Sequence, residues 1–123
     1  MVPAPSALVD VSDVSDLLVY RRAVQLADAL YSVASVWQSF DRWTLGVQMV
    51  RAADSVGANL AEAWGRDTRA DRRRMVFLAR GSACELEHWL GRAQSRKLRL
   101  PTNAPNEASE VSQMVNGLLR AWS

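Results

Sequence analysis

The stretch SVGANLAEAWGR, residues Ser55 to Arg66, combines the features of a buried helix with an ordered set of polar residues. Apolar residues, most of them small, recur at three- and four-residue steps, which is the spacing of one face of an α-helix. Asn59 and Glu62 stand beside that apolar face at the same spacing. Gly65 follows the last turn, where glycine commonly ends a helix. The stretch therefore predicts the C-terminal half of a helix that packs against other helices.

The helical pattern extends from this stretch in both directions and predicts four helices. The helix that holds the stretch is expected from about Thr44 to Trp64, and the next from about Arg69 to Arg96. Ser15 is the expected N-cap of the first helix, and Thr68 that of the third, because their hydroxyl groups can accept a bond from a free backbone N–H. The other two connections are expected at QSFDRW (38–43) and KLRLPTNAPN (97–106), and the last helix runs to the C-terminus.

Each expected helix carries an apolar stripe that it must bury against the others. The second helix has the stripe Leu45, Met49, Ala52, Val56, Leu60 and Ala63, and the third has Met75, Leu78, Ser82, Leu86, Trp89 and Ala93. Four amphipathic helices with short connections predict an all-α protein, an up-down-up-down four-helix bundle. We expect residues 1–15 to be a flexible N-terminal tail and residues 16–123 to form the bundle domain.

Length and composition fit a single domain and exclude several classes of protein. The chain has 123 residues, of which 49% are hydrophobic, and one cysteine, Cys84, which cannot form an intrachain disulfide. No apolar run approaches the roughly 20 residues that span a bilayer, so no membrane association is expected. The N-terminus lacks the basic start and apolar stretch of a secretory signal. We therefore expect a cytoplasmic protein.

Positive charge is concentrated in one segment of the chain. The net charge is +2, but residues 1–65 carry −3, residues 66–99 carry +6 and residues 100–123 carry −1. Five arginines crowd the expected start of the third helix: Arg66, Arg69, Arg72, Arg73 and Arg74. Cations at a helix N-terminus oppose the helix dipole, so this placement costs stability. The cluster predicts phosphate contacts, with Arg51 as a weaker member; salt bridges to acids of the first helix or of another subunit are the alternative.

The polar residues of the opening stretch need partners if they lie at a helix contact. A buried carboxylate without a cation is costly, and the third helix supplies Arg80 at a suitable level for an antiparallel neighbour. We predict a partly buried network in which Glu62 meets Arg80. Asn59 is expected to bridge to Ser82 or Glu85 in the same network.

Catalytic and metal chemistry find little support in the sequence. Glu85 and His88 form a Glu-x-x-His pair, but a di-iron bundle needs that motif twice, and His88 is the single histidine. No Gly-rich phosphate loop and no nucleophile elbow occurs. We therefore expect no catalytic residue, no metal and no cofactor, and predict a protein that is not an enzyme.

Two blocks of the chain resemble the 23S rRNA intervening-sequence proteins, a family of four-helix bundles that includes accessory proteins of diversity-generating retroelements. The blocks are WTLGVQMVRAADSVGANLAEAWGR (43–66) and FLARGSACELE (77–87), and VYRRAVQLADALY (19–31) is also similar. The matching polar positions are Arg51, Ser55, Asn59, Glu62, Arg66, Arg80, Gly81, Ser82, Glu85 and Glu87. Gly57 stands where the family usually has proline, and Ala63 where it usually has glycine.

The resemblance implies a homo-oligomer, with a pentamer favoured, and a partner that is RNA, DNA or a nucleic-acid enzyme such as a reverse transcriptase. The leading hypothesis is a non-enzymatic, self-associating bundle that binds nucleic acid or a nucleoprotein through its Arg-rich surface. The alternative is a purely structural or protein-interaction bundle whose arginines are spent on salt bridges. Five tryptophans fit either hypothesis, as core residues or as interface anchors: Trp37, Trp43, Trp64, Trp89 and Trp122.

Overall fold

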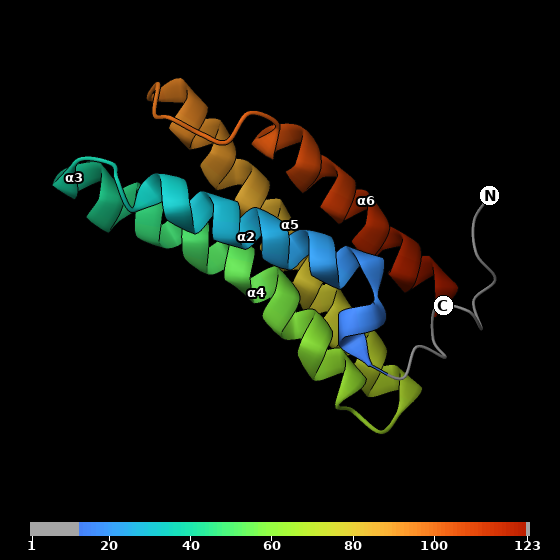
Figure 1. Ribbon diagram of the computed structural model, residues 1–123. Helices are drawn as coiled ribbons and strands as arrows, with labels where there is room; N and C mark the ends of the chain where they lie inside the picture. The colour runs from blue at the N-terminus through green and yellow to red at the C-terminus, as the bar shows by residue number, and fades with distance from the viewer. Residues whose placement is uncertain (1–12, 123) are drawn as a thin grey trace.

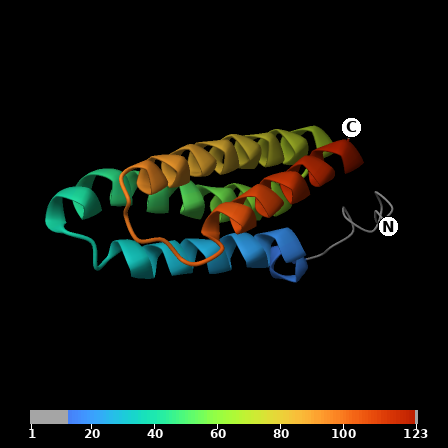
Figure 2. The ribbon, with the colours of Figure 1, turned by 90° about the horizontal axis from the view of Figure 1, so that it is seen from above.

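Four long helices make up most of the chain in the computed structural model, in which residues 13–122 are described. They are α2 (Leu18–Ala34), α4 (Val47–Trp64), α5 (Arg69–Ser95) and α6 (Ala104–Ala121). Successive helices run in opposite directions, with α4 between α2 and α5, and α6 against both α5 and α2 (Figures 1 and 2). The predicted all-α, up-down-up-down four-helix bundle is confirmed.

The first helix begins later than predicted, because an acidic residue forms a separate turn ahead of it. The Asp13 carboxylate accepts a hydrogen bond of 3.0 Å from the backbone N–H of Ser15 and caps the short 3₁₀ helix η1 (Val14–Asp16). This bond, together with the Ser15 side chain, lowers the pKa of the Asp13 carboxyl. Ser15 therefore lies inside η1, and its prediction as the N-cap of the first helix was wrong. The expected tail over residues 1–15 lies outside the described residues, except for the three that take part in this turn.

The segment predicted as the QSFDRW loop is helical from Ser39 onward. The turn α3 (Ser39–Asp41) continues into the π-helix η2 (Arg42–Gly46) and then into α4, so that one helical run extends from residue 39 to residue 64. Gly46 makes this run fit against α2: a Cβ there would lie 3.4 Å from the Asp41 carbonyl oxygen and 3.6 Å from the Ala34 Cβ. The wide π-turn thus packs closely against the end of α2.

Apolar side chains fill the interior in two clusters, one toward each end of the bundle. Within residues 13–122 the interior contains no buried polar side chain. The predicted stripe of α4 is confirmed, because all six of its residues are buried. Gly57 adds a close approach to α2, since a Cβ there would lie 3.3 Å from Val24 Cγ2. In this part of the chain no helix has both the length and the apolar character to span a bilayer.

The stripe predicted for α5 was partly wrong. Leu78 is 45% exposed and Ser82 is half-buried. The buried face consists of Met75, Val76, Ala79, Ala83, Leu86, Leu90 and Ala93. The small Ala79 and Ala83 let α4 pack closely there, and this contact turns the larger Leu78 toward solvent.

Helix α5 begins with a side-chain cap and ends with a residue in the left-handed conformation. Thr68 caps the start as predicted, with its hydroxyl oxygen accepting a 3.1 Å hydrogen bond from the backbone N–H of Asp71. At the other end Lys97 adopts a left-handed conformation with φ 59°. This lets the Leu98 N–H reach the Ala93 carbonyl at 3.0 Å. Glycine usually takes that position in such a helix end.

Replacing Lys97 with glycine is expected to stabilise the protein by up to about 1 kcal/mol. A side chain costs about 1–2 kcal/mol in the left-handed region, and the greater freedom of glycine in the unfolded chain offsets part of the gain. Urea denaturation followed by circular dichroism measures the change. Lys97→Ala is the matched control, because it removes the charge and keeps the Cβ. Equal stability of the glycine and alanine variants would contradict the argument from backbone conformation.

Candidate nucleic-acid interface

The five arginines of the predicted Arg cluster (Arg66, Arg69, Arg72, Arg73 and Arg74) lie at one end of the bundle. The α4–α5 connection, the beginning of α5 and the last turn of α6 meet at this end (Figures 1 and 2). Beneath them the rings of Trp64 and Trp122 pack with their centroids 5.3 Å apart. This aromatic contact belongs to the packed interior at the end of the bundle where the arginines lie.

One member of the Arg cluster has a carboxylate partner within residues 13–122. The Arg66 guanidinium pairs with Glu62, one helical turn earlier, and the two side chains are 39% and 49% exposed. Exposed pairs of this kind contribute little stability and are screened by salt. Glu62 therefore neutralises Arg66 only weakly.

The Arg69 and Arg72 side chains bond to backbone carbonyls instead of carboxylates. Arg69 donates to the Ala121 carbonyl at 3.3 Å, which ties the start of α5 to the end of α6. Arg72 Nε donates to the Arg66 carbonyl at 2.7 Å and holds the α4–α5 connection. A carbonyl oxygen carries no net charge, so both guanidinium groups keep their positive charge.

Arg73 and Arg74 form no hydrogen bond or ion pair within residues 13–122. The acids nearest in sequence, Asp67 and Asp71, are exposed and form no ion pair with the cluster in this part of the chain. Four of the five guanidinium groups are therefore not neutralised by a carboxylate of the described chain.

The predicted polar network forms only in part. Asn59 Nδ2 donates to Ser82 Oγ at 3.3 Å between α4 and α5, as expected. The predicted Glu62–Arg80 pair was wrong, because the Glu62 carboxylate pairs with Arg66, just beyond the end of α4. Arg80 instead lies over the Phe77 ring, with its Cζ 4.5 Å from the ring centroid.

Glu85 lies outside that network, on the exposed side of α5. Its carboxylate accepts a 3.0 Å hydrogen bond from Trp89 Nε1, one turn later. His88 is also exposed and meets the Trp89 ring edge-on, at 4.8 Å between centroids. Within residues 13–122 no three His, Cys, Asp or Glu side chains gather as metal ligands would.

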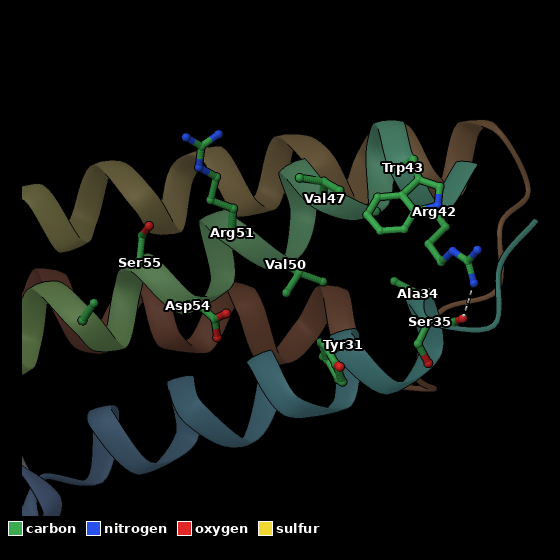
Figure 3. Close-up of a pocket in the computed structure, with 12 residues that line it drawn as sticks. Tyr31, Ala34, Ser35, Arg42, Trp43, Val47, Val50, Arg51, Asp54 and Ser55 are labelled. Carbon is green, nitrogen blue, oxygen red and sulfur yellow. Dashed lines mark hydrogen bonds between the residues drawn. The ribbon is translucent and has the colours of Figure 1, made fainter. Parts of the chain in front are cut away.

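Arg51 lies far from the Arg cluster, although the sequence grouped it there. Thirteen residues of α4 separate it from Trp64, the last residue before the α4–α5 connection, which corresponds to about 20 Å along the axis. It lines an open groove of about 730 Å³ between α2 and α4, together with Tyr31, Trp43 and Asp54. Figure 3 shows Arg51 pointing away from α2, whereas Asp54 points toward it. The structure therefore assigns Arg51 to a separate surface.

Exposed apolar side chains form a patch beside this groove, near α3. The apolar patch consists of Tyr31, Val36, Phe40, Trp43 and Val47, which are between 41% and 79% exposed. Of the five tryptophans, Trp37 and Trp122 are buried, Trp64 and Trp89 are half-buried, and Trp43 is 69% exposed. Phe40 was placed in the predicted QSFDRW loop and was not singled out as part of an exposed apolar surface. Two aromatic residues in a six-residue connection were the available signal.

The comparison with known proteins agrees with the fold. Residues 15–117 match the family model described as 23S rRNA-intervening sequence protein. None of the curated proteins matches the chain. The family match includes most of α6 and all of α2, α4 and α5, so it covers nearly the whole bundle. The chain belongs to the 23S rRNA-intervening sequence protein family.

Proposed function

We propose that this protein is a non-enzymatic, self-associating bundle that binds nucleic acid through the Arg cluster. The observation that carries the proposal is the lack of carboxylate partners: Arg66 alone among the five is paired with an acid within residues 13–122. Among the described residues the cluster forms no salt bridge to an acid of the first helix, which was one form of the alternative. Salt bridges to another subunit are the form of the alternative that the binding experiment must distinguish from the proposal.

The chemistry of the Arg cluster suits phosphate groups. Arginine presents a planar fork of N–H donors that matches the geometry of a phosphate. The cluster lies at the N-terminus of α5, where free backbone N–H groups and the helix dipole also favour an anion. No aromatic residue stands between the arginines from Arg66 to Arg74. Binding is therefore expected to depend on the backbone of the nucleic acid and to show little base specificity.

The family description supports RNA as the first nucleic acid to test. It names 23S rRNA, which gives the family an RNA-related context. Phosphate contacts alone do not distinguish RNA from DNA, so both are ligands of the proposal. A nucleic-acid enzyme such as a reverse transcriptase is a further expected partner, reached through the nucleic acid that both would hold.

Self-association is supported by the apolar patch and the groove beside it. Three residues of the patch, Tyr31, Trp43 and Val47, line that groove, and exposed apolar side chains that gather on a small protein commonly mark a protein contact. Arg51 and Asp54 line the groove and have no ion pair within residues 13–122, so two copies could supply each other with opposite charges. The patch and the Arg cluster lie at opposite ends of α4, which leaves the cluster free in the assembly. The resemblance to the family favours five subunits.

A titration of a short fluorescein-labelled RNA hairpin tests the binding. With four arginines on phosphates, counterion release predicts affinity that falls roughly 100-fold when salt rises from about 0.05 to about 0.2 M. Arg69→Gln with Arg74→Gln is expected to weaken binding roughly 25- to 100-fold at about 0.1 M salt. Arg92→Gln with Arg96→Gln is the matched control, because it removes the same charge from the far end of α5. Absence of binding at low salt, or equal losses in both variants, would remove the proposal in favour of the structural alternative.

A further inference from the structure

One face of α4 remains uncovered by the other helices of the described chain. Helix α4 packs between α2 and α5, and the residues on its outer side recur at alternating steps of four and three. That is the spacing of the seam along which two helices of a coiled coil meet. These exposed or half-buried residues, the last of them just after the helix, are Val47, Arg51, Asp54, Ala58, Ala61 and Gly65. We call this set the α4 seam.

Large apolar side chains stand at one end of this face and small residues at the other. Phe40, Trp43 and Val47, at the beginning of the helical run, are 79%, 69% and 41% exposed. Ala58 and Gly65 are exposed about three and five turns after Val47. A single chain cannot pack the large residues against the small ones, because both lie on one helix. A second copy that runs antiparallel brings large residues against small ones at both ends.

The surface beside the α4 seam is concave over most of the length of the helix. The groove of about 730 Å³ between α2 and α4 adjoins one of about 170 Å³, and Asp54 and Ala58 line both. The first groove includes Val47 and the second continues to Ala61, which is about 21 Å farther along the axis. A channel of that length suits a helix of the partner.

Opposite charges lie at the middle of the α4 seam. Arg51 and Asp54 are exposed, and neither forms an ion pair within residues 13–122. In an antiparallel pair of α4 helices centred midway between these two residues, Arg51 of each copy lies level with Asp54 of the other. The same centre brings Val47 of each copy level with Ala58 of the other. One register therefore satisfies both the charges and the sizes of the side chains.

We propose that α4 pairs antiparallel with α4 of a second copy along the α4 seam. This inference rests on the self-association in the proposed function and assigns the surface and the register of the contact. A parallel pair would place Arg51 against Arg51, and like charges across an interface are unfavourable. A two-fold contact joins copies in pairs, so the expected mass is twice the 13.6 kDa of the chain. Five subunits, which the family resemblance favours, require a contact between two different surfaces.

Charge reversal tests the register. Arg51→Glu puts two carboxylates level with each other in both halves of the pair, and Asp54→Arg does the same with two guanidinium groups. Each variant alone is expected to dimerise roughly 10- to 100-fold more weakly than the wild type. An equimolar mixture of the two variants restores both contacts between opposite charges, so it is expected to dimerise about as tightly as the wild type. Sedimentation equilibrium gives the dissociation constants, and circular dichroism melting verifies the fold.

Glu107→Arg is the matched control for Asp54→Arg. Glu107 is exposed on α6, which packs against α5 and α2 and lies away from the α4 seam. The control is expected to keep the dissociation constant of the wild type.

The outcomes separate this inference from the function on which it rests. A monomeric wild type would remove both self-association and the pairing of α4, while RNA binding by the Arg cluster is measured independently. A mass of five chains, or reversals that leave association unchanged, would overturn the antiparallel pairing and leave self-association in place. A mixture that associates as weakly as the separate variants would show that Arg51 and Asp54 do not face each other.

Discussion

Trp37→Ala is expected to lower the free energy of unfolding by about 3–5 kcal/mol, the usual cost of removing a large buried aromatic side chain. Trp37 is 7% exposed and packs in the cluster of buried residues beneath α3. Its Nε1 donates a 2.9 Å hydrogen bond to the Arg99 carbonyl, in the loop between α5 and α6. The side chain therefore joins the α2–α3 corner to a distant connection, and its loss leaves both a cavity and an unpaired carbonyl.

Trp37→Phe is the matched control for that prediction. It keeps an aromatic ring in the cavity but removes the N–H donor, so a smaller loss of about 1–2 kcal/mol is expected. Urea denaturation followed by circular dichroism gives both values. A loss below about 1 kcal/mol for the alanine variant would show that the corner does not depend on Trp37.

The fold could be predicted because local rules and packing agree along most of the chain. Along α4 and the turn before it, Leu45, Met49 and Leu60 all fall on one stripe, so periodicity identified the buried side from Leu45 to Ala63. Thr68 caps α5 as its chemistry predicts, because no other side chain competes for the Asp71 N–H. In these segments the sequence allowed one arrangement.

The errors occurred where the sequence allowed two arrangements. On α5 the larger Leu78 suggested one buried face, whereas close packing against α4 selects the face with Ala79 and Ala83. At QSFDRW the polar residues indicated a loop, but the segment continues α4 through a π-turn that packs against Ala34 and Trp37. These choices depend on contacts between helices, which periodicity along one helix does not contain.

In the candidate site, too, the features that depend on local sequence could be predicted, and those that depend on contacts between helices could not. The membership of the Arg cluster followed from the sequence, because five arginines in nine residues at a helix start must lie close together. The hydrogen-bond partners of these arginines could not be predicted from the sequence, because they include residues of other helices. Arg69, for example, donates to the Ala121 carbonyl at the end of α6. The groove that Arg73, Arg80 and Arg120 line between α5 and α6 also depends on helix pairing.

Phe40→Ser with Trp43→Ser is expected to convert the proposed oligomer into monomers. The two side chains are 79% and 69% exposed in the single chain, so the substitutions remove little that stabilises the bundle itself. Exposed substitutions usually change stability by no more than about 0.5 kcal/mol. Aromatic anchors at the centre of a protein interface, in contrast, commonly carry more than about 2 kcal/mol each. The double variant is thus expected to separate assembly from folding.

Light scattering coupled to gel filtration measures the molar mass, and circular dichroism melting verifies the fold. Leu78→Ser is the matched control, because Leu78 is 45% exposed but lies on α5, outside the apolar patch. A monomeric wild type would contradict self-association, and an unchanged mass in the double variant would place the interface elsewhere. The monomeric variant keeps the Arg cluster intact, so it is expected to retain salt-dependent binding of the RNA hairpin. It is expected to lose the gain in affinity that several linked cationic sites provide.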